Sequence, residues 1–488
     1  MRDLFIAAIL FFWVPFALFK PHMGVLLWDW ISHMNPHSTG HGFASTFPFL
    51  DFVAALTFAG FAISGDEKKL PAHPIILMIT LFFLWTVVTT FAGFNYDYSM
   101  GKLVRFIKVI LFAILTITIM QSPARLKAFV GVMTLSLLWI GVKGGLFTVL
   151  TGGAGMVQGA GGMMGDNNQL AVAMAMTVPL ALFWGQFPPR PWMKWPAYAS
   201  AFLTAICVVG TTSRGGTAAL VVTGIALFAK SRQKLTTLAI IIPLVAVIFS
   251  VMPDSYFAKL ETAENATEDS SFRNRVVMWK FATNLADENP IEGGGFSVFF
   301  NRRALELYLP YGSKIFNAHS IYFEVLGEHG YLGLLLFLTM IFTGWFAASR
   351  CYNTYKQYEE TAWIAGLCNA VRVSMIAYCA GGALLNMATF DLIYHMLAVI
   401  VLAEVVGARQ VEIGVTTIEE AARLRKLAEE AEGKKQGSFK PGGYVGGRGQ
   451  KKPGGSAPDL PDGGPGSGPD PVLGRDGRNF ARTRGDAS

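Results

Sequence analysis

The chain has 488 residues, of which 52% are hydrophobic, 13% aromatic and only 15% charged, and its formal net charge is +7. This composition excludes an ordinary soluble enzyme, because soluble domains carry about 25% charged residues. The segment from residue 408 onward is polar and rich in glycine, proline and charge. The part before it is therefore even more apolar than the average, and we expect an integral membrane protein.

Apolar stretches of a length that can cross a bilayer, about 17 to 25 residues, recur up to residue 407. We predict twelve spans, at 3–19, 43–63, 73–93, 103–120, 125–149, 167–186, 193–210, 215–229, 235–252, 320–347, 361–385 and 388–407. The first has no small-residue cleavage site before Lys20 and Pro21. We therefore expect a retained span and not a signal peptide.

The Lys and Arg residues of the connections predict the orientation, since cytoplasmic loops carry an excess of them. With a cytoplasmic N-terminus, one set of alternate connections holds most of the loop cations, including Lys68, Lys69, Arg125, Lys127, Arg190, Lys194, Arg350 and Lys356. The other side has little beyond Lys20, Lys102 and Arg214. We expect both termini to be cytoplasmic.

The predicted fold is all-α, with nine spans in 1–252, a long outer loop at 253–319, three spans in 320–407 and a cytoplasmic tail at 408–488. In the loop, "FRNRVVMWKFATNLADENP" has apolar residues at helical spacing, which predicts an amphipathic helix ending near Pro290. Gly293–Gly295 then predicts a tight turn that brings backbone close to another segment. The tail is expected to be a charged helix followed by a disordered segment.

Four cations are predicted to meet on the outer face: Arg214, Arg273, Arg275 and His319. Arg214 is either a snorkelling residue at a helix end or a ligand for an anion, and the loop arginines serve solubility or binding. His319 is either an interfacial side chain or a general base, because imidazole titrates near neutral pH. Arginine forks suit phosphate oxygens, which favours a lipid-linked pyrophosphate as partner.

A second group of cations, Lys102, Arg105 and Lys108, recurs every three residues in "SMGKLVRFIKVILF". Cations within a span are functional candidates, and an anionic lipid head group is the ligand we expect. Simple snorkelling of Lys102 is the alternative. Arg372, Asp391 and His395 are assigned only to pairing between helices.

The sequence predicts no cofactor, no metal ligand set and no nucleic-acid partner. It has no HExxH motif, and the glycine-rich "GGAGMVQGAGGMMGDNN" lacks the GK[ST] ending of a phosphate-binding loop. The four cysteines, Cys207, Cys351, Cys368 and Cys379, lie in or beside apolar stretches without CxxC spacing. We expect buried thiols that form neither a disulfide nor a zinc site.

Three segments, "TTSRGG", "RVVMW…NPIEGGGFSVF" and "NAHSIYFEVLGEHGYLG", resemble in order the landmarks of the O-antigen ligase and polymerase superfamily of bacterial envelope proteins. The resemblance covers about residues 165 to 405. It implies an inner-membrane, metal-independent glycosyltransferase that moves a glycan from undecaprenyl pyrophosphate to a periplasmic acceptor. It also implies that His319 is the general base and that Arg214 and Arg275, or Arg273, hold the pyrophosphate.

The acceptor separates three activities within that superfamily. We favour a ligase that uses the lipid A-core oligosaccharide, with inversion at the anomeric carbon because no carboxylate nucleophile is evident. A polymerase and a protein O-oligosaccharyltransferase remain open. A transporter or flippase of lipid-linked sugars is the alternative from another class, and it would spread charges through a central path.

Overall fold

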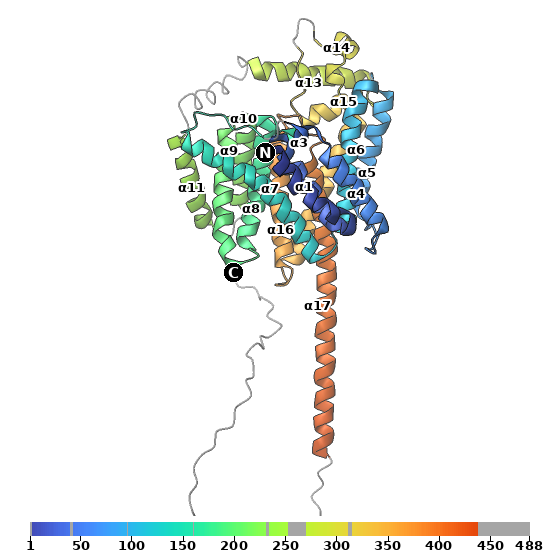
Figure 1. Cartoon of the computed structure of the whole chain (residues 1–488), viewed down its shortest axis with the longest axis vertical. Coiled ribbons are helices and arrows are strands. Elements are labelled where there is room, and N and C mark those ends of the chain that lie inside the picture. Colours follow the sequence, from blue (N-terminus) through green and yellow to red (C-terminus); the bar gives the residue numbers. More distant parts are fainter. Residues whose placement is uncertain are drawn as a thin grey trace, which may run out of the picture. The chain divides into compact units, whose positions relative to one another are not determined.

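The computed structural model describes residues 2–39, 42–94, 96–159, 161–230, 234–251, 270–310 and 315–437, and these residues form helices and connections but no strand. Contacts divide the chain into residues 1–421 and 422–488. In the first unit most helices stand side by side, and α13 lies across one end of them (Figure 1). Helices suit a membrane because each satisfies its own backbone hydrogen bonds.

Within the described ranges, fourteen helices are longer than one or two turns. They are α1 (Arg2–Phe19), α2 (Pro21–Met34), α4 (Phe49–Ile63), α5 (Pro74–Ala92), α6 (Tyr96–Ile119), α7 (Pro123–Leu150), α8 (Asn167–Gln186), α9 (Lys194–Gly210), α10 (Arg214–Lys230), α11 (Lys234–Val251), α13 (Ser270–Glu288), α15 (Ile321–Tyr355), α16 (Ala362–Gly382) and α17 (Asp391–Gly437). The short ones are η1 (Pro36–Thr39), α3 (Phe43–Thr46), η2 (Gly162–Met164), η3 (Pro191–Met193), η4 (Val298–Phe300) and α14 (Arg302–Tyr308).

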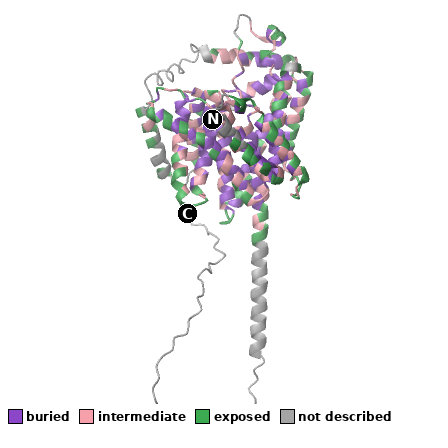
Figure 2. Cartoon of the chain, in the orientation of Figure 1, coloured by how far each residue is buried: buried purple, intermediate pink, exposed green. Residues whose placement is uncertain are grey.

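Each of the twelve predicted ranges is mostly helical, although 43–63 contains the short α3 as well as α4 and 320–347 is interrupted at Gly330. In the part of the chain that the structure describes, six helices have both the length and the hydropathy to cross a membrane, namely α5, α7, α8, α15, α16 and the 391–414 part of α17. Buried residues run through the middle of the bundle (Figure 2), and α8 is among the most enclosed of its helices, with 78% of its apolar window buried. Local signals begin several of them: the Ser122 side chain accepts a hydrogen bond from Arg125 N at the start of α7.

The N-terminal region contains a helix that we did not predict. The ring of Phe11 in α1 contacts Phe49 at the start of α4, whereas Gly60 near the end of α4 packs on the backbone of Leu18. Helices α1 and α4 therefore run parallel, and α2 returns between them. The prediction that these two spans are antiparallel, with the N-terminus on the side of Lys68, is wrong. Its cause is that α2 has only 14 residues, too few for a span.

The cysteine prediction is also wrong for one pair. Cys351 and Cys368 are joined by a disulfide, while Cys207 is a buried thiol and Cys379 a half-buried one. The two bonded cysteines are 17 positions apart. They meet because a short connection makes α15 and α16 antiparallel neighbours, so residues near their facing ends lie side by side.

The predicted amphipathic helix and glycine turn of the outer loop are both confirmed. Helix α13 covers the expected segment, and Gly293 and Gly295 have φ of 63° and 79°. Gly294 N and Gly295 N donate to the carbonyl oxygens of Gly327 and Glu328 at 2.9 and 2.8 Å. The turn thus packs on α15, which is the close backbone approach that the glycines predicted. Residues 252–269 and 311–314 of the predicted loop lie outside the described residues.

Helix α15 is interrupted where the turn meets it. Gly330 has φ 69° and ψ −172°, and Tyr331 N donates to Pro290 O at 2.8 Å. The predicted span 320–347 is therefore two helical segments that meet at Gly330. At the other end of the chain, α17 continues without a break past residue 408, as a charged helix was expected to do. The predicted disordered tail from 438 lies outside the described residues.

The substitution Gly330→Ala tests this packing. A Cβ at residue 330 would overlap the carbonyl group of Ile291, and a positive φ costs an L-residue about 1–2 kcal/mol by itself. We expect a lower melting temperature of the purified protein. Gly101→Ala on α6 is the control, since a Cβ there meets nothing within 4 Å, and helix propensity predicts a gain of about 0.5–1 kcal/mol. Equal melting temperatures for both variants would contradict the assigned role of Gly330.

Candidate functional site at one end of the bundle

His319 lies in the extended segment that leads into α15. Its neighbours Ala318 and Ser320 are buried, and its own φ is 46°, a conformation that non-glycine residues rarely adopt. Trp279 of α13 holds this segment: its Nε1 donates to Ala318 O at 2.9 Å, and its ring stacks on Phe323 at 4.9 Å. Helix α13 therefore fixes the position of His319.

Arg275 lies one helical turn before Trp279 and is half-buried, whereas Arg273 is exposed. Burial, and then the Arg275 guanidinium, lower the pKa of His319 below its ordinary value of 6.5, while the carboxylates of Asp166 and Glu324 oppose the shift. The shift favours the neutral form of the imidazole. A neutral imidazole beside a guanidinium can accept a proton while the cation holds an anion.

Arg214 begins α10 at the same end of the bundle. Ser213 caps this helix by accepting a hydrogen bond from Gly216 N at 3.1 Å, which leaves the half-buried Arg214 in its first turn. In the turn before α10, the carbonyl oxygen of Thr211 accepts a hydrogen bond from Asn167 Nδ2 at 2.9 Å. The first residues of α8 and α10 therefore lie together.

A chain of amide side chains connects α8 to the His319 segment. Gln169 Nε2 donates to Asn386 O at 3.0 Å, and Asn386 Nδ2 donates to Asn317 Oδ1 at 2.7 Å. Asn317 precedes His319 by two residues. The structure thus brings the segments that carry Arg214, Arg275 and His319 to one end of the bundle, and Arg273 is exposed on α13.

Below this end lies a buried ionic cluster that the sequence analysis missed, formed by Lys102 of α6 and Glu324 and Glu328 of α15. Lys102 Nζ is 2.7 Å from Glu324 Oε1 and 2.8 Å from Glu328 Oε2, and the two carboxylate side chains are 4% and 3% exposed. Two glutamates four residues apart in a predicted span were the available signal, because they share one helix face.

The three cations predicted to contact a lipid head group occupy different environments. Lys102 is taken up by two carboxylates, Arg105 is exposed and bonds to the backbone at Gly101, and Lys108 pairs with the exposed Asp51 at 2.6 Å. They do not form one set. Head-group binding by Arg105 and Lys108 stays a prediction.

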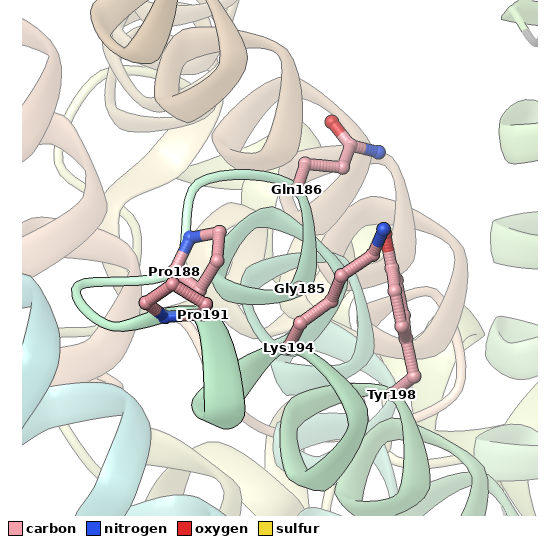
Figure 3. Close-up of a pocket in the computed structure, with 6 residues that line it drawn as sticks. All are labelled: Gly185, Gln186, Pro188, Pro191, Lys194 and Tyr198. Carbon is pink, nitrogen blue, oxygen red and sulfur yellow. The ribbon is translucent and has the colours of Figure 1, made fainter.

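A separate pocket of about 480 Å³ lies at the other end of α8, lined by Gly185, Gln186, Pro188, Pro191, Lys194 and Tyr198. Figure 3 shows the Lys194 and Tyr198 side chains of α9 side by side next to Gly185. Because Asp166 and Asn167 are at the opposite end of that helix, this pocket is not part of the candidate site.

Comparison with known families gives two matches. Residues 199–338 match a family described as O-antigen ligase, and residues 1–189 match a family of unknown function. A search of curated proteins finds no match. The first segment contains Arg214, Arg273, Arg275 and His319, together with both glutamates of the ionic cluster, and the second contains Lys102.

Replacing Lys102 by methionine tests the ionic cluster. The change leaves two carboxylates buried together, and breaking a buried pair costs about 3–5 kcal/mol. We expect a strongly lowered melting temperature. Lys108→Met on the same helix is the matched control, because its exposed pair with Asp51 is worth about 0–1 kcal/mol. If both variants melt alike, the cluster does not stabilise the fold.

Proposed function

We propose that this chain, whose residues 199–338 match the O-antigen ligase family, is a member of that superfamily and a periplasmic glycan ligase of the bacterial inner membrane. It transfers a glycan from undecaprenyl pyrophosphate to the lipid A-core oligosaccharide. The observation that carries the proposal is that α13, which bears Arg275, docks on the His319 segment through the hydrogen bond from Trp279 Nε1 to Ala318 O, within the segment that matches the family.

In the proposed reaction His319 removes the proton from the acceptor hydroxyl as its oxygen attacks the anomeric carbon. The bond between that carbon and the pyrophosphate oxygen breaks, and the electron pair leaves with the pyrophosphate. Arg214 and Arg275 stabilise this departing anion, because guanidinium groups bind phosphate oxygens in pairs. A single displacement inverts the anomeric carbon. The proposed reaction needs no cofactor, since the arginines supply the positive charge.

The arrangement of the cations favours Arg275 over Arg273 as the donor ligand. Arg273 is exposed on α13, whereas Arg275 is half-buried and acts on His319. It also favours a ligase over a polymerase. A polymerase binds two lipid-linked glycans and needs a second cation set, and Lys102, the first member of the candidate set, is neutralised by Glu324 and Glu328.

The direct test is transfer by the purified protein, with a lipid-linked glycan donor and lipid A-core acceptor in EDTA-treated buffer. We expect His319→Gln to keep the fold and lose transfer by about 10²–10⁴-fold, the usual contribution of a general base. His73→Gln is the control histidine variant, because His73 pairs with Glu404 of α17. Transfer of the glycan to a protein or to a growing glycan, and not to lipid A-core, would show that the proposed acceptor is wrong. Donor movement across vesicles without transfer would instead support a transporter.

The pH dependence tests the contact between Arg275 and His319. The base form is needed, so activity falls as pH drops through the pKa of His319, which lies below 6.5. Because the Arg275 charge lowers that pKa, Arg275→Gln should move the acid limb of kcat/KM to higher pH and raise the KM for the donor. Arg273→Gln should do neither. If Arg275→Gln left the acid limb unchanged, Arg275 would not act on the pKa of His319 and this contact would be ruled out.

A further inference from the structure

A second group of polar side chains is buried between α2 and α17, outside the candidate site. Asp29 and His33 come from α2 and His395 from α17, and their side chains are 0%, 0% and 2% exposed. One ligand atom from each lies within 4.8 Å of the other two. Among the described residues, these three side chains form the histidine and carboxylate group whose spacing would suit a bound metal ion.

The two histidine side chains converge on Asp29. His33 Nδ1 is 3.0 Å from the carbonyl oxygen of Asp29, one turn earlier, and 3.2 Å from its Oδ1. His395 Nδ1 is 3.5 Å from Asp29 Oδ1. This spacing is close to the edge of a tetrahedron of ligands about 2.0–2.1 Å from a zinc ion.

Four polar atoms of these side chains form no hydrogen bond of good geometry with the described residues, although His33 Nδ1 lies 3.2 Å from Asp29 Oδ1. Both carboxylate oxygens of Asp29, Nε2 of His33 and Nδ1 of His395 are buried without a hydrogen-bond partner in the described part of the chain. Buried polar atoms are normally paired. Four such atoms on three adjoining side chains indicate a ligand that satisfies them together.

The charges of the neighbourhood call for a divalent cation. Asp391 lies one turn before His395, and its oxygens accept bonds from the Ser32 hydroxyl at 2.5 Å and from Leu392 N at 2.9 Å. Across the described ranges, no lysine or arginine pairs with Asp29 or Asp391. Protonating both histidines would balance the two carboxylates only by placing two cationic rings 5.1 Å apart, which repel. One divalent ion balances them with neutral imidazoles.

We infer that Asp29, His33 and His395 form a binding site for one divalent transition-metal ion, with zinc as the best match to two nitrogens and one carboxylate oxygen. Phe112 and Phe129 pack against His395, with ring centroids at 4.8 and 6.0 Å, and close the site on that side. Asp391 and Ser32 form a hydrogen-bonded support beside the ligands.

The metal fastens α2 to α17, two helices far apart in sequence. None of its three ligands lies in the segment that matches the O-antigen ligase family, and none is among the groups that shift the pKa of His319. The site is therefore structural and separate from the proposed transfer reaction, so it stands or falls independently of that proposal.

Metal analysis of the full-length protein, purified in detergent and equilibrated with micromolar zinc, is the test. We expect about one ion per chain in the wild type, since such sites bind tightly, and at least a tenfold loss in His33→Gln and His395→Gln. Asp391→Asn should weaken binding about 10–100-fold as a supporting group. His37→Gln, just beyond α2, is the matched control and should keep the metal.

Cobalt loading and heat stability give two further readouts. Cobalt should produce the visible absorption of a tetrahedral site in the wild type and not in His395→Gln, and zinc should raise the melting temperature of the wild type alone. Asp29→Asn preserves shape, so a normal size-exclusion profile with lost metal separates binding from folding. A wild-type protein without stoichiometric zinc, or a cobalt spectrum that His395→Gln leaves unchanged, overturns the proposal.

Discussion

The two ion pairs of Lys102 connect the halves of the molecule. Lys102 belongs to the segment that matches a family of unknown function, while Glu324 and Glu328 belong to the O-antigen ligase segment. Each carboxylate makes one further bond, Glu324 to Ala388 N and Glu328 to Ser297 N. One lysine thus holds the start of α15, the connection before α17 and the glycine turn in register. A buried pair is costly to desolvate, so its presence here indicates a geometric role.

That register positions the candidate site. His319 and Glu324 flank the start of α15, so the helix that carries the glutamates also sets where the imidazole enters the bundle. Helix α13 then adds Arg275 above it, through the Trp279 bond to Ala318. The buried neighbours on both sides of His319 hold it at its unusual φ. Strained backbone of this kind is commonly found at functional sites. The site exists only when α8, α10, α13 and α15 are packed.

Hydropathy and periodicity were sufficient for the helices of the twelve apolar ranges and for the elements of the long loop, because those depend on local sequence, but they missed α2. The twelve apolar ranges, α13 and the Gly293–Gly295 turn all follow from spacing within about twenty residues. Contacts between helices far apart in the sequence could not be predicted from these local patterns. Lys102 and Glu324 are 222 positions apart, so neither residue carries a local sign of the other. The disulfide was missed for a related reason, since only the antiparallel packing of α15 and α16 brings its cysteines together.

Helix α2 accounts for the error in the predicted topology of the first two spans. Its 14 residues are too few for a span, and its Asp29 and His33 are buried in the structure. With α2 in place, the junction at Lys20 moves to the end of the bundle that holds Lys68, and His22 beside it lies near Asp66 and Arg125. Lys20 therefore lies at the end of the bundle that also holds Asp66 and Arg125. Lys102 and Arg214 lie toward the other end, where Lys102 is paired with two carboxylates and Arg214 begins α10 at the candidate site.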